Sequence, residues 1–314
     1  MKHLNGHPRR RLLLTVLIIL GFVAILPRPA GGGAEPSALI LLSLKIKPYE
    51  SLAEKLTGEL DGFRTEVLSL DVDPQASRRI TELSPDVVVC VGQEAFRQSM
   101  RHRDAVPIVY TMVLFPEQIL ADPPQDVRGV AMIPSPGRQL LVLNEGFHFR
   151  RVAVFFNPDV TGKLVSSFGR SVPKGMDWQP IPVKSDVELL RKLKQGLPDV
   201  DGVLLVPDPT VLSEQGLKAL INRCYKEEVP IVGFSPMYLD LGAALSLSLN
   251  EEEIARQAVS IARKENGASA DRIGNLYYPR PCEIRINSKA EERLGFSVDE
   301  KALVRFGTVR RSES

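Results

Sequence analysis

Two aspartates in this sequence follow predicted strands, where they could act as a general acid and a general base. Asp159 comes shortly after the apolar run 152–156, and Asp208 follows the run 202–206. Carboxyl ends of parallel strands meet at one edge of a sheet, so both carboxylates could reach one substrate. Prolines adjoin both aspartates, however, and carboxylates in such positions more commonly form turns and cap helices. The pattern favours capping and leaves acid–base chemistry as the alternative.

The thiol and imidazole side chains show no arrangement typical of metal sites. Cys90 lies in the apolar run 87–91 and Cys224 in a helical stripe, where small buried thiols usually lie. With Cys282 the total is three, so one cysteine must stay unpaired within the chain. The histidines, which are His3, His7, His102 and His148, lack the spacing of metal ligands. We therefore predict neither a metal site nor a disulfide framework.

Motifs of common enzyme classes are missing from the sequence. No strand is followed by G-x-G-x-x-G, and neither a Walker phosphate loop nor a G-x-S-x-G turn occurs. A Ser-His-Asp triad lacks a suitable histidine, because His102 lies at a basic helix end and His148 in a linker. We therefore expect a binding protein without a cofactor rather than an enzyme.

The charge of the chain is concentrated in its first residues. Of the 314 residues, 44% are apolar and 25% charged, as in an ordinary folded protein. Five basic and no acidic residues precede Glu35, so the remaining chain carries 35 basic and 38 acidic side chains, a net charge of −3. Binding to nucleic acid depends on concentrated positive charge, so we do not expect a nucleic-acid partner.

The first 34 residues have the layout of a secretory signal. Basic residues up to Arg11 precede the apolar run 12–26, which leads through Pro27 into the small residues 30–34. The run is shorter than the roughly 20 residues that a membrane span needs. We therefore expect a cleaved signal peptide, with a retained membrane anchor through residues 12–26 as the alternative. Both place the protein outside the cytoplasm, in the periplasm or on the outer face of the cytoplasmic membrane.

The elements that would position the candidate residues alternate along the chain. Short apolar runs followed by amphipathic segments are typical of parallel sheets covered by helices. The first round has predicted strands at 38–44, 65–70, 87–91 and 108–111, with helices at 49–60, 74–83 and 94–101. The proline-rich segment 112–136 then interrupts the alternation.

A second round of the same kind follows the interruption. Its predicted strands are 152–156, 178–183, 202–206, 231–234 and 243–249, and its helices are 137–144, 163–170, 185–196, 213–228 and 250–267. Ser185 and Glu188 have the spacing of a reciprocal N-cap, and Asn250 is placed to begin the last helix. Two such rounds predict an α/β protein with two Rossmann-like lobes, parallel sheets and a ligand cleft between the lobes.

Several segments resemble one family of binding proteins. They are VPIVYTMVL at 106–114, residues 127–157, VLLVPDPT at 203–210, VPIVGFS at 229–235, and the stretch from Gly242 to EIRINSKAEERLGF. Over nearly the whole body, and in the same order, the chain is similar to ABC-transporter substrate-binding proteins of the tryptophan and aromatic amino-acid type. That family has the type I periplasmic-binding-protein fold.

The resemblance implies a domain organisation and a partner. Residues 35–131 with about 245–280 would form the N-terminal lobe, residues 132–244 with about 281–304 the C-terminal lobe, and residues 305–314 a tail. Segments around 128–134 and 245–250 would flex as a hinge. A small solute held in the cleft would be delivered to an ABC permease in the inner membrane.

The resemblance also implies ligand-binding residues on both lobes. Those of the first lobe are Gln93, Glu94, Tyr110 and Thr111. Those of the second lobe are Asn157, Asp159, Asp208, Thr210, Ser235 and Tyr238. Similar proteins carry hydroxyl residues in place of Gln93 and Glu94, and an acidic residue where Pro236 follows Ser235. These departures leave the ligand open. Apolar residues near the strand ends, which are Met112, Phe115, Phe156, Met237 and Tyr238, either line a pocket or belong to the core.

Two functions follow from these expectations. The first is an extracytoplasmic solute receptor of an ABC-type importer that closes around its ligand by a hinge. The second is a membrane-anchored ligand sensor or accessory module of a signalling system, which the missing lipid-anchor cysteine near the leader makes credible. A DNA-binding regulator would need a helix-turn-helix before the first strand, where this sequence has the leader instead.

Overall fold

The computed structural model describes residues 35–116, 119, 124–264 and 270–312. The leader 1–34, to which the signal and anchor predictions apply, lies outside these residues, and residues 35–314 form a compact unit of their own. Within the described ranges, no helix is both long and apolar enough to cross a membrane. This unit contains two seven-stranded sheets, each with helices on its two faces, which confirms the predicted two-lobed α/β fold.

The first lobe is built on the sheet β11-β12-β5-β4-β3-β1-β2. Its strands are β1 (Ser37–Leu42), β2 (Arg64–Ser69), β3 (Val87–Val91), β4 (Ile108–Thr111), β5 (Val127–Val130), β11 (Ala270–Ile273) and β12 (Leu276–Pro279). Its helices are α1 (Lys47–Glu59), α2 (Arg79–Leu83), α3 (Gln93–Ser99) and α9 (Glu251–Ala262). Neighbouring strands are parallel except in the β11–β12 hairpin.

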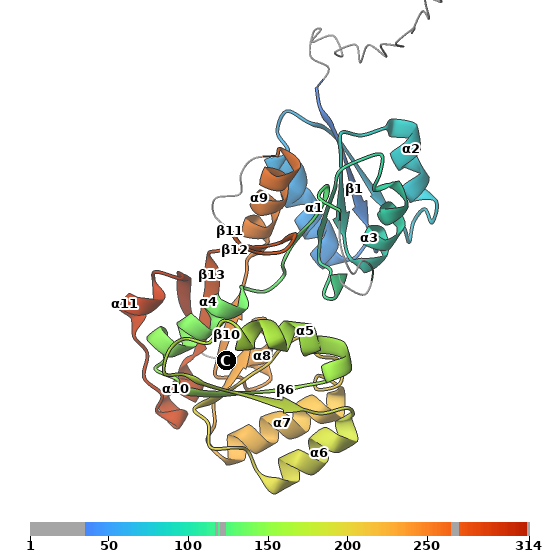
Figure 1. The fold of residues 1–314 in the computed structure, drawn as a ribbon. Coiled ribbons are helices and arrows are strands. Elements are labelled where there is room, and N and C mark those ends of the chain that lie inside the picture. The colour runs from blue at the N-terminus through green and yellow to red at the C-terminus, as the bar shows by residue number, and fades with distance from the viewer. Residues whose placement is uncertain (1–34, 117–118, 120–123, 265–269, 313–314) are drawn as a thin grey trace, which may run out of the picture. The chain divides into compact units, whose positions relative to one another are not determined.

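Helices on both faces explain why the central strands of this lobe are uninterrupted apolar runs. Helices α1 and α9 cover one face of the sheet, and α2 and α3 the other (Figure 1). Every residue of β3 is buried, as expected for a parallel strand covered on two sides. The edge strand β2 is only half-buried and carries Arg64 and Glu66. The apolar pattern therefore distinguishes the central strand β3 from the edge strand β2.

The second lobe repeats this plan with the order β14-β13-β10-β9-β8-β6-β7. Its strands are β6 (Arg151–Phe156), β7 (Asp177–Pro182), β8 (Gly202–Leu204), β9 (Ile231–Gly233), β10 (Leu245–Ser248), β13 (Cys282–Asn287) and β14 (Gly307–Ser312). Its helices are α4 (Pro136–Leu141), α5 (Pro158–Gly169), α6 (Asp186–Gln195), α7 (Glu214–Lys226), α8 (Met237–Asp240), α10 (Ser288–Leu294) and α11 (Glu300–Leu303). Only the β10–β13 pair is antiparallel among its ladders.

The chain passes between the two sheets three times. It leaves the first sheet after β5, returns after β10 to form α9 and the hairpin, and leaves again after β12. Residues 245–248, expected in the first lobe, instead pair with β9 and β13 in the second. Residues 307–312, expected in a tail, form the edge strand β14. Since β14 has only one apolar residue, Val309, its sequence resembles an exposed terminus more than a strand.

The predicted helix caps are present in the second lobe and at α9. The Ser185 hydroxyl accepts a hydrogen bond of 3.2 Å from the Glu188 backbone N–H, and the Asn250 side chain accepts one of 2.8 Å from Glu253. The return bond of Glu188 goes one residue further back than expected, because its carboxylate accepts from the Lys184 N–H at 2.9 Å. Both helices therefore begin where the sequence predicts.

The three cysteines are free and buried, as predicted for Cys90 and Cys224. Burial raises the pKa of the Cys90 and Cys224 thiols to about 12 and that of Cys282 to about 11. These thiols are therefore protonated near neutral pH and act as small apolar side chains of the core.

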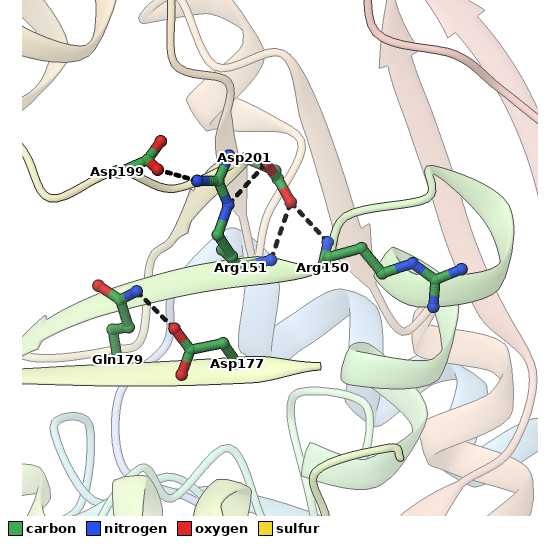
Figure 2. Close-up of polar contacts among 6 residues, drawn as sticks. All are labelled: Arg150, Arg151, Asp177, Gln179, Asp199 and Asp201. Atoms are coloured by element: carbon green, nitrogen blue, oxygen red, sulfur yellow. Dashed lines mark hydrogen bonds and ion pairs between the residues drawn. The ribbon is translucent and has the colours of Figure 1, made fainter. Parts of the chain in front are cut away.

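Charged side chains gather at the amino ends of the second sheet, where they hold neighbouring strands together. Figure 2 shows Arg151 of β6 between Asp199 and Asp201, the two aspartates before β8. The Asp201 carboxylate also accepts from the backbone N–H of Arg150 at 2.7 Å and of Arg151 at 2.8 Å. Partial burial by itself raises the pKa of Asp201, but the hydrogen bonds from Arg151 and these backbone groups outweigh it and leave the pKa lowered.

We predict that Asp201→Asn removes a pH-dependent part of the stability. The folded pKa of Asp201 lies below its unfolded value, so the ionised carboxylate stabilises the fold above the unfolded pKa. That contribution is lost as the pH falls through the folded pKa. At pH 7 the variant should lose about 1.5–3 kcal/mol, the usual range for hydrogen bonds to a charged group. Urea denaturation of both proteins at pH 7 and at acidic pH measures the difference, and a loss that is equal at both would contradict this assignment.

Candidate functional site

Asp208, at the carboxyl end of β8, is completely buried and binds four donors of its own lobe. One carboxylate oxygen accepts from the Asn157 backbone N–H at 2.6 Å and from the Thr161 hydroxyl. The other accepts from the backbone N–H of Thr210 at 2.9 Å and of Val211 at 3.2 Å. These donors come from the start of α5 and from the loop after β8. Asp208 therefore joins two strand-end loops, which agrees with the capping interpretation.

Asn157 is the N-cap of α5 and the second member of this network. Its side-chain oxygen accepts from the Asp159 backbone N–H at 3.0 Å, and its amide donates to the Thr210 hydroxyl at 3.0 Å. Pro158 occupies the first helical turn, where its missing N–H costs nothing. The helix thus begins at Pro158, five residues before the predicted start, and the sequence Asn157-Pro158 is the signal that would have placed it.

The two carboxylates considered for acid–base chemistry differ in environment. Asp159 is exposed in the first turn of α5, while Asp208 is enclosed. The structure brings Asn157, Asp208 and Thr210 into direct contact, and Asp159 joins them only through its backbone N–H. This group is a rigid support at the edge of the second sheet.

Ser235 and Tyr238 lie in one turn after β9. The Tyr238 backbone N–H donates to the Ser235 carbonyl oxygen at 3.2 Å, which starts the short helix α8. Tyr238 is buried against Phe234, with ring centroids 4.9 Å apart, and burial raises the pKa of its hydroxyl. Met237 beside it is 58% exposed. Tyr238 therefore belongs to the core, whereas Met237 projects from the strand-end loops.

In the first lobe, the turn between β3 and α3 has a glycine that no other residue can replace without strain. Gly92 has φ 94° and ψ 167°, a conformation that essentially only glycine adopts. A Cβ atom there would lie 2.6 Å from the Ser43 hydroxyl oxygen and 2.8 Å from the Tyr49 ring. The Ser43 hydroxyl also accepts from the Ala95 backbone N–H at 2.8 Å. Ser43 and Tyr49 thus frame this turn.

Gln93 and Glu94 follow Gly92 as the first residues of α3. The Glu94 carboxylate pairs with Arg97 at 2.6 Å and accepts from the Gln98 amide at 3.2 Å. Its charge is therefore partly balanced within the helix. Gln93 is partly exposed beside it.

Tyr110 and Thr111 at the end of β4 lie inside the lobe rather than on its surface. The Tyr110 ring stacks on Phe96 at a centroid distance of 4.1 Å and lies against Gly129, where an added Cβ would be 2.2 Å from the ring. Thr111 is fully buried, and its carbonyl oxygen accepts from the Gly92 N–H at 2.9 Å. Tyr110 and Thr111 therefore stabilise the end of the sheet. Contact with a solute would come from the loop that follows them.

That loop contributes to a cavity of about 230 Å³ whose walls come from both lobes. The first lobe supplies 113–116, 131 and the β12 residues Leu276 and Tyr278. Helix α5 supplies Lys163, Leu164 and Ser167, together with its C-cap residue Arg170. The remaining lining residues are Met132, Ile133 and Pro207. Phe115, one of the apolar residues considered for a pocket wall, lines this cavity. The sequence prediction did not include these α5 residues, because they lie along a helix and not at the strand ends, although 163, 167 and 170 share one face of a helix.

A larger cavity of about 590 Å³ lies in the first lobe alone, between α1 and the edge strand β2. Its floor includes Leu42, Ala53 and Val67, and Val67 is 43% exposed because no helix covers β2 on that face. The second lobe contributes no residue to it, so hinge closure would not enclose a solute there. The cavity shared by the two lobes is therefore the better candidate site.

Comparison with solved structures agrees with this architecture. A ligand-free substrate-binding protein with adhesive properties from Clostridium difficile matches with a TM-score of 0.66 and 12% identity, over 88% of this chain and all of that one. A Streptococcus pneumonia ABC domain in complex with L-Trp matches with a TM-score of 0.55 and 15% identity, over the same shares. A conserved domain protein from Vibrio cholerae gives 0.56 and 18%, again over 88% and 100%.

The chain has the type I periplasmic-binding-protein fold. Two mostly parallel seven-stranded sheets in two lobes are the features it shares with these structures. No family model matches the sequence, and no curated protein matches it. Identities below 25% establish the fold alone. The tryptophan or aromatic ligand therefore stays a prediction.

Proposed function

We propose that this protein is an extracytoplasmic solute-binding protein that holds a small organic solute between its lobes. The cavity lined by both lobes carries this proposal, because a ligand there contacts strand-end loops of each sheet at once. Three chain crossings between the sheets supply a natural hinge. A solute that bridges the lobes would favour the arrangement in which both sets of contacts are made.

The proposal also includes polar residues of the strand-end loops as ligand contacts in a closed state. Near the strand ends, Gln93 and Glu94 on the first lobe and Ser235 on the second are partly exposed, and Asp159 is exposed. Asn157, Asp208 and Thr210 would act behind them by holding the loops in place. Export by the leader and delivery to an ABC permease are further parts of the proposal, supported by the apolar run 12–26 and by the fold.

We predict that residues 35–314 bind at least one small metabolite with a measurable thermal shift. A ligand present at about 100 times its Kd stabilises a folded protein by about 2.7 kcal/mol, which raises the melting temperature by several degrees. A broad metabolite panel screened by thermal shift, followed by small-angle scattering of any hit, tests binding and compaction together. A folded protein that shifts with no metabolite would count against solute binding.

The anchored sensor is the competing proposal, and the leader distinguishes the two. Mass spectrometry of the protein from its native envelope should show loss of residues 1–34 for a released receptor. An intact N-terminus that fractionates with membranes would favour the sensor.

A further inference from the structure

The cavity shared by the lobes combines an apolar body with a cationic edge. Leu114, Phe115, Ile133, Leu164 and Pro207 are among its apolar walls, and Val113 and Ala131 are buried behind its opening. Hydrocarbon and ring surfaces of this kind favour an apolar solute, since burying such a solute removes it from water. At about 230 Å³ the cavity is smaller than the roughly 300–1,000 Å³ pockets of drug-sized ligands, so the solute should be compact.

The cationic edge is a stripe along α5. Lys163, Ser167 and Arg170 are spaced by four and three residues, which places them on one face of the helix, and all three line the cavity. The hydroxyl of Ser167, which donates to the Leu164 carbonyl oxygen at 2.6 Å, lies between the two charges in sequence. A ligand anion at this face would meet an ammonium and a guanidinium together.

Among the described residues, no carboxylate balances the charges of Lys163 and Arg170. Neither Lys163 nor Arg170 forms an ion pair with a carboxylate in the part of the chain that the structure describes, and the described lining of the cavity contains no Asp or Glu. Their charge is therefore available to a ligand. At this edge of the cavity, an ammonium group would meet two positive charges and no carboxylate of the described lining, which disfavours it there.

We infer that this site selects a compact apolar carboxylate without an ammonium group, held at its charged end by Lys163 and Arg170. The inference rests on the proposed function and names its solute class. The planar Arg170 guanidinium suits a two-point contact with a carboxylate, and Lys163 adds a second positive charge. The apolar remainder of the solute would lie against Phe115 and Leu164.

A matched set of probes tests this selection by isothermal titration calorimetry. Phenylacetate and indole-3-acetate are apolar carboxylates, phenylacetamide is neutral, phenethylamine is a cation, and L-phenylalanine is a zwitterion. We expect the carboxylates to bind at least roughly tenfold more tightly than the other three, as one charge-assisted contact provides. Equal binding of phenylacetamide or of L-phenylalanine would overturn the inference.

Charge-removing variants test the two named residues. Lys163→Gln and Arg170→Gln should each weaken phenylacetate binding roughly tenfold and leave the weak binding of phenylacetamide unchanged. Lys194→Gln, on the exposed side of α6, is the matched control and should bind phenylacetate like the unaltered protein. Since Lys163 and Arg170 are exposed, folding should be retained, which thermal denaturation checks. Unaltered phenylacetate affinity in both variants would remove these residues from the site.

The outcomes separate this inference from the proposed function. If zwitterions or sugars in the metabolite panel bind while the apolar carboxylates do not, the solute class is wrong and solute binding stands. If neither the panel nor the matched probes bind to folded protein, both proposals fail.

Discussion

Replacement of Asp208 by asparagine should lower the free energy of unfolding by about 3 kcal/mol, the largest effect we expect from a polar substitution in this protein. The buried carboxylate accepts from four donors, two on each oxygen. An asparagine offers one acceptor oxygen, and its NH₂ group would face two of those donors. Urea denaturation with an unchanged m-value would identify the loss as one of native stability.

Asp159→Asn is the matched control for this substitution. Its carboxylate is exposed in the first turn of α5, where a negative charge interacts only with the helix dipole. We expect a change below about 1 kcal/mol. Should Asp208→Asn keep its stability but lose solute binding, Asp208 would be a ligand contact and its supporting role would be wrong.

Gly92→Ala should destabilise the first lobe by roughly 2–4 kcal/mol, the sum of a strained backbone and a steric clash. The backbone at φ 94° and ψ 167° suits glycine, and the new Cβ would press on Ser43 and Tyr49. The Tyr49 ring is partly buried and packs against the core of the first lobe, so moving it away from the new Cβ would cost core contacts. Thermal and urea denaturation measure the loss.

Gly162→Ala, in the second lobe, should have the opposite effect on stability. Gly162 lies inside α5, and a Cβ atom there meets nothing within 4 Å. The alanine should therefore stabilise the protein by about 0.5–1 kcal/mol through the lower entropy of the unfolded chain. Equal effects of the two glycine substitutions would contradict the assignment of Gly92 as a conformational requirement.

The fold could be predicted because its signals are local. The runs at 87–91 and 108–111 match β3 and β4, and Ser185 and Asn250 mark the helices that they cap. Strands that depend on distant partners were harder to predict. β5 lies within the proline-rich segment 112–136, and β14 is recognisable as a strand only through its pairing with β13.

The candidate site was predictable at the level of loops but not of side chains. Strand-end loops do surround the shared cavity, yet Tyr110 points into the core because Gly129 leaves space for its ring. A sequence read one element at a time does not show such a pairing across strands. Lys163 and Arg170 were missed for a related reason, since the direction of a helix face depends on the lobe against which it packs.

The three passages of the chain between the sheets also bear on how the protein is made. The first sheet lacks β11 and β12, and the second lacks β13 and β14, until the last fifty or so residues have left the ribosome. Neither lobe can finish folding as a continuous segment during synthesis. A truncation that removes the chain from β11 onward would therefore take strands from both sheets at once.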